Sequence, residues 1–277
     1  MGALEYVRMT RPPNSALSAL GAALAYLAFS GSDHGWGLVA ISAFTGYAAT
    51  ASTMLVNDYV DVEVDRVNKP WKPLPSGRAS PEIALAVAAS LATASATANA
   101  LAAGPAPFVA VVVYLALGWA YCFLRRMWWN HVLVALSTTG PAVYGYVLAG
   151  LPIPWLPFVA TYSATIFTTT LGREAVKALQ DVEGDARLGY SSIPIRWGRS
   201  AALGLIAAAG VIGPVLGIAS WFTAPAGPGY LLAMLIAGAI YSCAAFSAVR
   251  SGGRSLEAAR RAMLGAMGIG IMALALL

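Results

Sequence analysis

The chain has 277 residues, of which 58% are hydrophobic and 10% are charged, and its formal net charge is +5. A soluble globular domain carries about 25% charged residues, and a mean hydropathy of +0.69 is far too high for a disordered chain. These values exclude both classes and leave an integral membrane protein, surrounded by membrane lipids and without a nucleic-acid partner.

Uncharged windows follow one another along the whole chain. They cover residues 15–29, 37–56, 83–103, 108–123, 132–150, 155–171, 202–222, 230–249 and 262–277. Because about 20 residues cross a bilayer as a helix, we expect an all-α bundle of nine transmembrane helices around a central cavity, forming one domain over residues 1–277. The first window also fits a secretory signal peptide, since Arg8 and Arg11 precede it. The later windows favour a membrane anchor instead.

The basic residues determine the expected orientation. With the amino terminus in the cytoplasm, all 17 Lys and Arg residues fall in cytoplasmic segments, as the positive-inside rule requires. The loops that carry the acidic clusters are then cytoplasmic, and the carboxyl terminus lies outside.

The second window ends in a cluster of acidic residues, residues 57–65. On a helix that continues through this segment, Asp58, Asp61 and Asp65 fall within about 60° of one another, with Asn57 at the edge. Glu63 points elsewhere and is expected to pair with a neighbouring base in solvent. Like charges on one face are stable mainly when a cation lies among them, and all-oxygen ligands suit Mg²⁺.

A second acidic cluster follows the sixth window, at residues 172–185. On a helix, Glu174, Lys177, Asp181 and Asp185 form one stripe, with Glu183 away from it. A salt-bridged helix end at the membrane interface is the alternative for either cluster alone. Two acidic helices facing each other across a cavity are more typical of a Mg²⁺-diphosphate site.

Basic loops follow both clusters, at residues 66–78 and 187–198. We expect Arg66, Lys69 and Lys177, which adjoin the carboxylates, to hold phosphoryl oxygens. Membrane topology alone explains the remaining bases of interest, which are Lys72, Arg78, Arg196 and Arg199.

The string Asn57-Asp58-x-x-Asp61-x-x-x-Asp65, the Lys69-Pro70 to Gly77 stretch and Asp181-x-x-x-Asp185 together resemble the paired aspartate signature of UbiA-type intramembrane prenyltransferases. The resemblance covers the whole chain. Arg11-Pro12 with Asn14, and Tyr121 before Asn130, also fit it, whereas Arg125 and Arg126 stand where members often carry a lysine.

The resemblance implies that the diphosphate of a prenyl donor lies between two Mg²⁺-bearing helices. The implied metal ligands, for two ions, are Asp58, Asp61, Asp65, Asp181 and Asp185. With these aspartates, Lys177 and Tyr121 are implied to be catalytic. The implied substrate-binding residues are Asn57, Arg66, Lys69, Asn14, Arg11, Glu174, Arg125 and Arg126. Aromatic rings can shelter an allylic cation, and the candidates are Tyr121, Tyr144, Tyr146 and Tyr162.

The string from Gly172 to Asp185, with Ile193-Pro194-Ile195 downstream, is most similar to the archaeal branch of the family that makes ether lipids. This implies geranylgeranyl diphosphate as donor and geranylgeranylglyceryl phosphate as acceptor, with Arg125, Arg126 or Arg11 near the acceptor phosphate. An aromatic prenyltransferase of the 4-hydroxybenzoate type remains the alternative within the family. A divalent cation transporter is the alternative outside it, but transport sites lie near the bilayer midplane, and both acidic clusters lie at one end. A membrane scaffold would leave the aligned aspartates unexplained.

Overall fold

The computed structural model describes residues 2–277, apart from the side chains of Asp33, Val67 and Asn68. Every regular element in this range is a helix. In chain order the elements are α1 (Ala3–Met9), α2 (Pro12–Ser30), η1 (Gly31–Asp33), α3 (Trp36–Val60), α4 (Val62–Asn68), α5 (Pro81–Ala102), α6 (Pro105–Phe123), α7 (Asn130–Thr138), α8 (Gly140–Leu148), η2 (Ile153–Trp155), α9 (Leu156–Arg187), α10 (Ile193–Trp221), α11 (Pro228–Arg250), α12 (Leu256–Ala273) and η3 (Leu274–Leu276).

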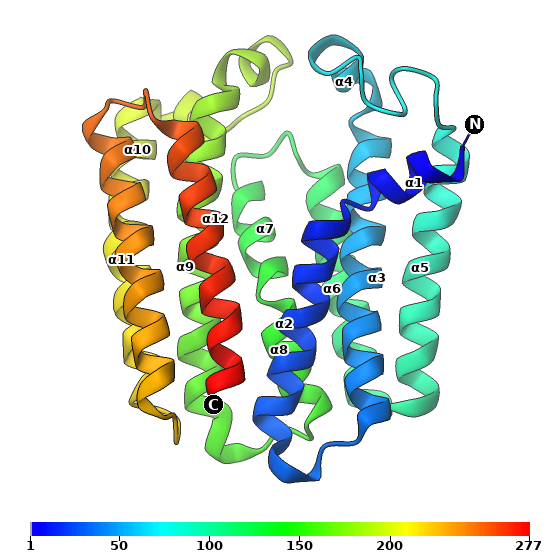
Figure 1. Cartoon of the computed structure of the whole chain (residues 1–277). Coiled ribbons are helices and arrows are strands. Elements are labelled where there is room, and N and C mark those ends of the chain that lie inside the picture. Colours follow the sequence, from blue (N-terminus) through cyan, green and yellow to red (C-terminus); the bar gives the residue numbers. More distant parts are fainter. Residues whose placement is uncertain (1) are drawn as a thin grey trace.

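The long helices stand side by side as one bundle (Figure 1). Within the described residues, six helices are long and apolar enough to cross a membrane, namely α3, α5, α6, α10, α11 and α12. Many large apolar side chains on these helices point outward and are exposed, among them Val112, Val211 and Leu232. Such a surface is stable only in lipid, so the protein is a multi-pass membrane protein.

The remaining three uncharged windows fall on helices of a different kind. α2 begins at Pro12 with polar residues in its first turn, and α9 ends in a charged segment. The window at residues 132–150 is divided into α7 and α8, because Pro141 has no backbone N–H and cannot continue the first helix. The count of nine spans stays a prediction.

The two chain ends lie toward opposite ends of the bundle (Figure 1). The amino terminus lies at the end that carries α4 and the connection from α9 to α10. α9 has 32 residues, which rise about 48 Å and exceed the hydrocarbon thickness of about 30 Å. Its last turns therefore project beyond the membrane at the end of the bundle that carries α4, and both acidic clusters lie at this end.

Packing divides the bundle into two sets of helices that enclose a space between them. α9, α10, α11 and α12 share one apolar core around Ile206, Tyr241 and Met263. α1, α3, α5 and α6 share another around Leu55, Val56 and Cys122. α2 joins the two sets by packing on α3, α8 and α12.

Glycine allows the close approach of α2 to its neighbours. A Cβ atom on Gly46 of α3 would lie 2.5 Å from the carbonyl oxygen of Ser18, and one on Gly145 of α8 would lie 2.5 Å from the Cβ of Ala25. Small residues permit such backbone contact between membrane helices. These contacts fix α2, and with it Asn14, against the wall that carries the first acidic cluster.

Candidate active site

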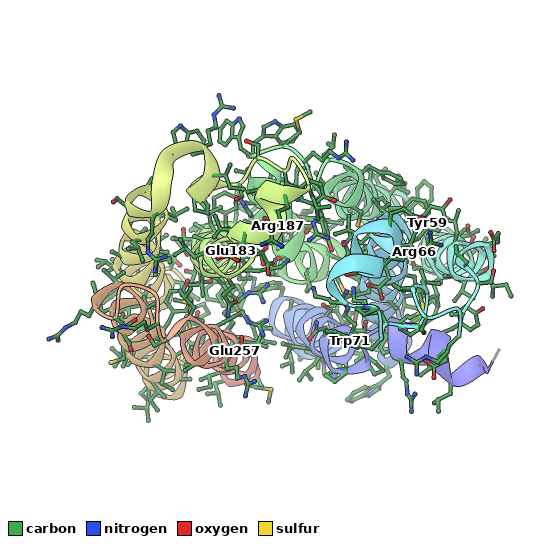
Figure 2. The ribbon with its side chains drawn as sticks, turned by 90° about the horizontal axis from the view of Figure 1, so that it is seen from above. Tyr59, Arg66, Trp71, Glu183, Arg187 and Glu257 are labelled. Carbon is green, nitrogen blue, oxygen red and sulfur yellow. The ribbon has the colours of Figure 1, made fainter. Side chains whose placement is uncertain are left out.

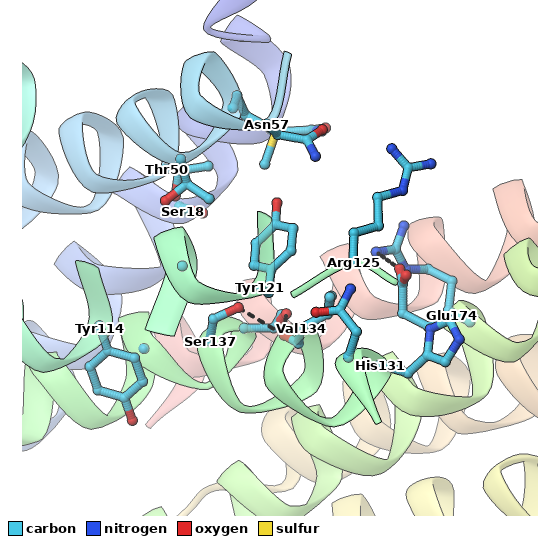
Figure 3. A pocket seen from close by; sticks show the side chains of 18 of the residues that line it. Ser18, Thr50, Asn57, Tyr114, Tyr121, Arg125, His131, Val134, Ser137 and Glu174 are labelled. Carbon is cyan, nitrogen blue, oxygen red and sulfur yellow. Dashed lines mark hydrogen bonds and ion pairs between the residues drawn. The ribbon is translucent and has the colours of Figure 1, made fainter. Parts of the chain in front are cut away.

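A cavity of about 400 Å³ opens between the two sets of helices. α2, α3, α6, α7, α8 and α9 line it, together with residues 190–192 and one side chain of α12, Arg260. Tyr121 stands in this cavity with its hydroxyl directed toward the side where Asn57 lies (Figure 3). Glu174, Lys177, Asp181 and Asp185 of the second acidic cluster line this cavity. The first cluster reaches it through Asn57 and through Arg125, the ion-pair partner of Asp61, whereas its three aspartates are not among the lining residues.

The first acidic cluster lies at the end of α3, at the junction with α4. Asp58, Asp61 and Asp65 are 6%, 2% and 3% exposed. The Lys72 ammonium binds two of them, lying 3.0 Å from Asp58 Oδ1 and 2.5 Å from Asp65 Oδ2. The expectation that topology alone explains Lys72 is therefore wrong, because the loop after α4 folds back and places this lysine between two buried carboxylates.

Asp61 interrupts the helix that the sequence predicts through residues 57–65. α3 ends at Val60, and α4 begins at Val62. The carboxylate of Asp61 turns to the Arg125 guanidinium, with which it forms an ion pair, and accepts a hydrogen bond of 3.2 Å from the Asn57 amide. Asp61 consequently faces a different cation from Asp58 and Asp65, although all three aspartates are buried at one site.

Arg11 links α1 and α2 and reaches the same cluster. Its Nη2 donates to Asp58 Oδ1 at 3.0 Å and to Asn57 Oδ1 at 3.4 Å. Its backbone has φ 49° and ψ 66°, in the left-handed region, directly before Pro12. Such a conformation costs of order 1–3 kcal/mol in a residue other than glycine, and it aims the guanidinium at Asp58.

The second acidic cluster forms the predicted stripe. α9 is continuous through residue 187, and Glu174, Lys177, Asp181 and Asp185 all line the cavity. Glu174 is buried and accepts from Arg173 Nη2 at 3.0 Å, with Lys177 Nζ at 3.7 Å. Among the described residues, Asp181 and Asp185 have no ion-pair or side-chain hydrogen-bond partner, in contrast to the first cluster.

Burial weakens the ionisation of two of these acids. It raises the pKa of the Asp61 carboxyl, an effect that exceeds the opposing influence of the Arg125 guanidinium. The pKa of Asp185, at the projecting end of α9, is raised for the same reason. Both carboxylates would therefore gain from a further positive charge.

The carboxylate oxygens of the two acidic clusters are suitable ligands for a Mg²⁺ ion, although the described side chains do not surround a metal position. Among them, no three His, Cys, Asp or Glu groups lie close enough to hold a metal as they stand, since cations separate the carboxylates of the first cluster. Asp61 Oδ1 is nevertheless buried with no hydrogen-bond partner in the described part of the chain. Mg²⁺ prefers oxygen ligands. This unpartnered carboxylate oxygen and the carboxylates of Asp181 and Asp185 therefore suit it.

Several predicted site residues do not reach the cavity. Arg66 pairs with Glu63 at 2.8 Å, and both side chains are exposed, which confirms the expected solvent role of Glu63. Lys69 is exposed. Arg126 is exposed and lies over the ring of Tyr190. Figure 2 looks onto this end of the bundle, with Arg66 on the α4 side and Glu183 and Arg187 on the α9 side.

The four candidate aromatic residues separate into three places. Tyr121 and Tyr144 line the main cavity. Tyr162 lines a smaller apolar cavity of about 90 Å³, whose walls come from α9, α10, α11 and α12 with residues of α2, α7 and α8. Tyr146 packs edge-on against Phe29 in the apolar core, with ring centroids 5.9 Å apart.

Some residues that line the cavity were not predicted from the sequence. His131 lies in the first turn of α7 next to Asn130, which the family resemblance did include; Arg173 precedes the acidic stripe by one residue, and Arg260 comes from α12. Arg173 lies within the string that carried the family resemblance, so a signal for it was present. Arg260 lies 75 residues beyond the end of the second acidic cluster at residue 185, and only helix packing brings it to the cavity.

Comparisons with known proteins agree with this architecture. The digeranylgeranylglyceryl phosphate synthase of Methanopyrus kandleri is 30% identical over 274 residues, covering 97% of each chain. The protein of the same name from Thermococcus kodakarensis is 28% identical, covering 94% of this chain and 91% of its own.

Solved structures share the fold. A structure described as a digeranylgeranylglyceryl phosphate synthase aligns with a TM-score of 0.78 at 22% identity, over 98% of this chain and 96% of that one. A UbiA homologue from Archaeoglobus fulgidus bound to GPP and Mg²⁺ aligns with a TM-score of 0.74 at 17% identity, over 95% and 99%. The family model for the UbiA prenyltransferase family matches residues 17–272, and this chain therefore belongs to that family.

Proposed function

We propose that this protein transfers a geranylgeranyl group from geranylgeranyl diphosphate to the free hydroxyl of geranylgeranylglyceryl phosphate, in the synthesis of archaeal ether lipids. In this reaction the bond between C1 of the prenyl group and the diphosphate oxygen breaks. A bond from C1 to the acceptor oxygen forms, the hydroxyl loses its proton, and diphosphate leaves.

One observation carries the proposal. Acidic residues near the end of α9 line a cavity that continues between apolar helices, and Arg11 and Arg125, the partners of the buried aspartates at α3–α4, line the same cavity. This arrangement suits a molecule with a strongly anionic head and a long hydrocarbon tail. The choice of acceptor rests on the names of the relatives, which are 30% and 28% identical over nearly their whole length.

The residues suit Mg²⁺ held by Asp58, Asp61 and Asp65 on one wall and by Asp181 and Asp185 on the other, with two ions as the proposed number. Mg²⁺ would neutralise the diphosphate and make it a better leaving group. Arg11, Lys72 and Arg125 already lie among the acidic groups. Their N–H groups can donate to phosphoryl oxygens and stabilise the negative charge that develops on the leaving group.

The walls below the acidic residues protect the allylic cation from water. Tyr121 and Tyr144 present aromatic rings to the cavity, and Gly118, Val111 and Ala49 present apolar surface. A ring face attracts a cation by its quadrupole, and an apolar wall leaves few competing nucleophiles near the reacting carbon.

The orientation follows from the same assignment. All Lys and Arg residues fall in segments predicted on one side, and the two acidic clusters lie at that end of the bundle. We therefore propose that the amino terminus and the site face the cytoplasm, where soluble Mg²⁺ and diphosphate exchange freely, and that the carboxyl terminus lies outside.

An acceptor panel with geranylgeranyl diphosphate held constant tests the proposal. Purified protein in detergent or nanodiscs receives geranylgeranylglyceryl phosphate or 4-hydroxybenzoate, and products are measured by mass spectrometry. Mg²⁺-dependent formation of the diether lipid supports the proposal. Prenylation of 4-hydroxybenzoate alone would assign the protein to the aromatic branch, and Mg²⁺ uptake without any transfer would favour a transporter.

A further inference from the structure

We infer that Arg260, together with Arg173 and Lys177, forms a separate anion subsite on the α9–α12 wall of the cavity, and that this subsite binds the phosphate monoester of the acceptor. The inference rests on the proposed function and names the residues that select its acceptor. Sequence reasoning placed the acceptor phosphate at Arg125, Arg126 or Arg11, and the geometry points elsewhere.

The cations of the opposite wall are already neutralised. Arg11 and Lys72 bind Asp58, Lys72 also binds Asp65, and Arg125 binds Asp61. Three cations thus face three buried carboxylates. Arg126 points to the surface and does not line the cavity. This wall has no surplus positive charge for a second anionic ligand.

The α9 side of the cavity has such a surplus. Arg173 and Lys177 share a single carboxylate, that of Glu174. Arg173 Nε is buried and has no hydrogen-bond partner within the described residues. A buried donor without a partner is unfavourable, so a ligand that accepts its hydrogen bond would be bound more tightly. Both side chains line the cavity.

Arg260 approaches from the neighbouring helix, held in position by Glu257. Its Nε and Nη2 each donate a hydrogen bond of 3.0 Å to the Glu257 carboxylate. Glu257 also accepts a hydrogen bond of 3.1 Å from the side-chain amide of Gln180 on α9. This leaves Arg260 Nη1 without a hydrogen-bond partner among the described residues. α12 and α9 run in opposite directions (Figure 1). Arg260, one turn after Glu257 on α12, therefore lies level with Lys177, one turn before Gln180 on α9.

The charge of this subsite favours an anionic ligand. Arg173, Lys177 and Arg260 face the carboxylates of Glu174 and Glu257, which leaves one positive charge. A phosphate monoester carries a charge of about −1.5 to −2 at pH 7. An uncharged acceptor head would leave this surplus unused.

The subsite is also separate from the acids assigned to the donor. Arg173 precedes Asp181 by eight residues on one helix, a rise of about 12 Å. The donor diphosphate near Asp181 and Asp185 and the acceptor phosphate near Arg173 can therefore bind together, with the reacting carbon between them. His131 and Asn130 line the cavity on the facing helix, α7.

A comparison of two acceptors tests the assignment. The parent and Arg260→Gln are each assayed with geranylgeranylglyceryl phosphate and with geranylgeranylglycerol, which lacks only the phosphate. A charge-assisted hydrogen bond is worth about tenfold to a hundredfold in affinity. We expect the parent to prefer the phosphorylated acceptor in kcat/KM, and Arg260→Gln to reduce that preference by at least about tenfold, with KM for the donor unchanged.

Arg261→Gln is the matched control. Arg261 pairs with the same Glu257 carboxylate, but its side chain is 77% exposed, so the acceptor preference should stay at the parent value. Activity on geranylgeranylglycerol shows that each variant is folded. If Arg260→Gln is inactive on both acceptors, Arg260→Lys is compared with the parent in its place. Lysine keeps the charge but lacks the planar fork of donors, so we expect a partial loss of the preference for phosphate, and a full preference overturns the assignment.

The outcomes separate the two ideas. If the parent uses the phosphorylated acceptor and Arg260→Gln keeps the full preference for phosphate, the subsite assignment is overturned and the proposed function stands. If the parent does not prenylate the phosphorylated acceptor at all, the proposed function fails, and the subsite fails with it.

Discussion

Within the described residues, Lys72 is the one cation that two buried carboxylates share, and its removal therefore tests the structure of the site directly. Its Nζ lies 3.0 Å from Asp58 and 2.5 Å from Asp65, and its side chain is 21% exposed. In Lys72→Met, Asp58 keeps Arg11, whereas Asp65 loses its only ion-pair partner among the described residues. Breaking a buried pair costs about 3–5 kcal/mol. Partial exposure of the lysine reduces this to about 2–3 kcal/mol, or a fall in Tm of about 4–10 °C.

Thermal unfolding in detergent, followed by tryptophan fluorescence without Mg²⁺, measures this loss. Lys69→Met is the matched control, because Lys69 is three residues away and exposed, and its Tm should equal that of the parent. Adding Mg²⁺ should raise the Tm of Lys72→Met by more than that of the parent, since the metal replaces the missing charge. Equal melting temperatures for the two methionine variants would refute the assigned position of Lys72.

Three further predictions concern packing, the second acidic cluster and the metal. Gly46→Val should destabilise the protein by about 1–3 kcal/mol through overpacking against the Ser18 backbone. Gly204→Ala, where a Cβ atom would meet nothing within 4 Å, should instead stabilise α10 by up to about 1 kcal/mol. Chemical denaturation measures the free energy of unfolding of both variants, and similar values would contradict the close approach of α2 and α3. Asp181→Asn should reduce kcat by at least about a hundredfold. Glu183→Gln, at an exposed position of the same helix, should leave kcat within about twofold of the parent value. An equal loss of kcat in both variants would contradict the assignment of Asp181 and its helix face to the site. Chelation with EDTA should abolish transfer, and the Mg²⁺ concentration for half-maximal activity should rise as the pH falls. The reason is that burial raises the pKa of Asp61 and Asp185, so protons compete with the metal at a higher pH than for ordinary aspartates; a constant Mg²⁺ requirement across the acid range would refute this competition.

Helical periodicity was sufficient to predict the second acidic cluster. Glu174, Lys177, Asp181 and Asp185 recur at spacings of three and four residues, and the helix that carries them is continuous, so all four face the cavity. The first cluster was predicted less completely. Its aspartates are buried together, but the helix breaks at Asp61, and an ion pair with Arg125, 64 residues away, turns that carboxylate to a different cation.

The basic partners depend on loop and helix packing, which local patterns do not contain. Arg66 and Lys69 are closer in sequence to the aspartates than Lys72, yet the fold of residues 69–77 brings only Lys72 among them. In the same way, Arg260 joins the site because α12 packs on α9 and Glu257 bonds to Gln180. Spacing along the chain predicts which residues share a helix face, but not which helix will stand opposite.

The break between α7 and α8 has a consequence for the contents of the cavity. α7 has nine residues, so the break lies about 13 Å along the helix axis, roughly halfway through the hydrocarbon layer. Pro141 donates no backbone hydrogen bond there, and irregular backbone at such depth is tolerated where it lines a hydrated space. Thr138, Gly140 and Pro141 do line the cavity. We therefore expect water to fill the empty cavity down to mid-membrane, so that an entering isoprenoid chain expels it. Donor affinity should then increase with osmotic stress imposed by an excluded solute.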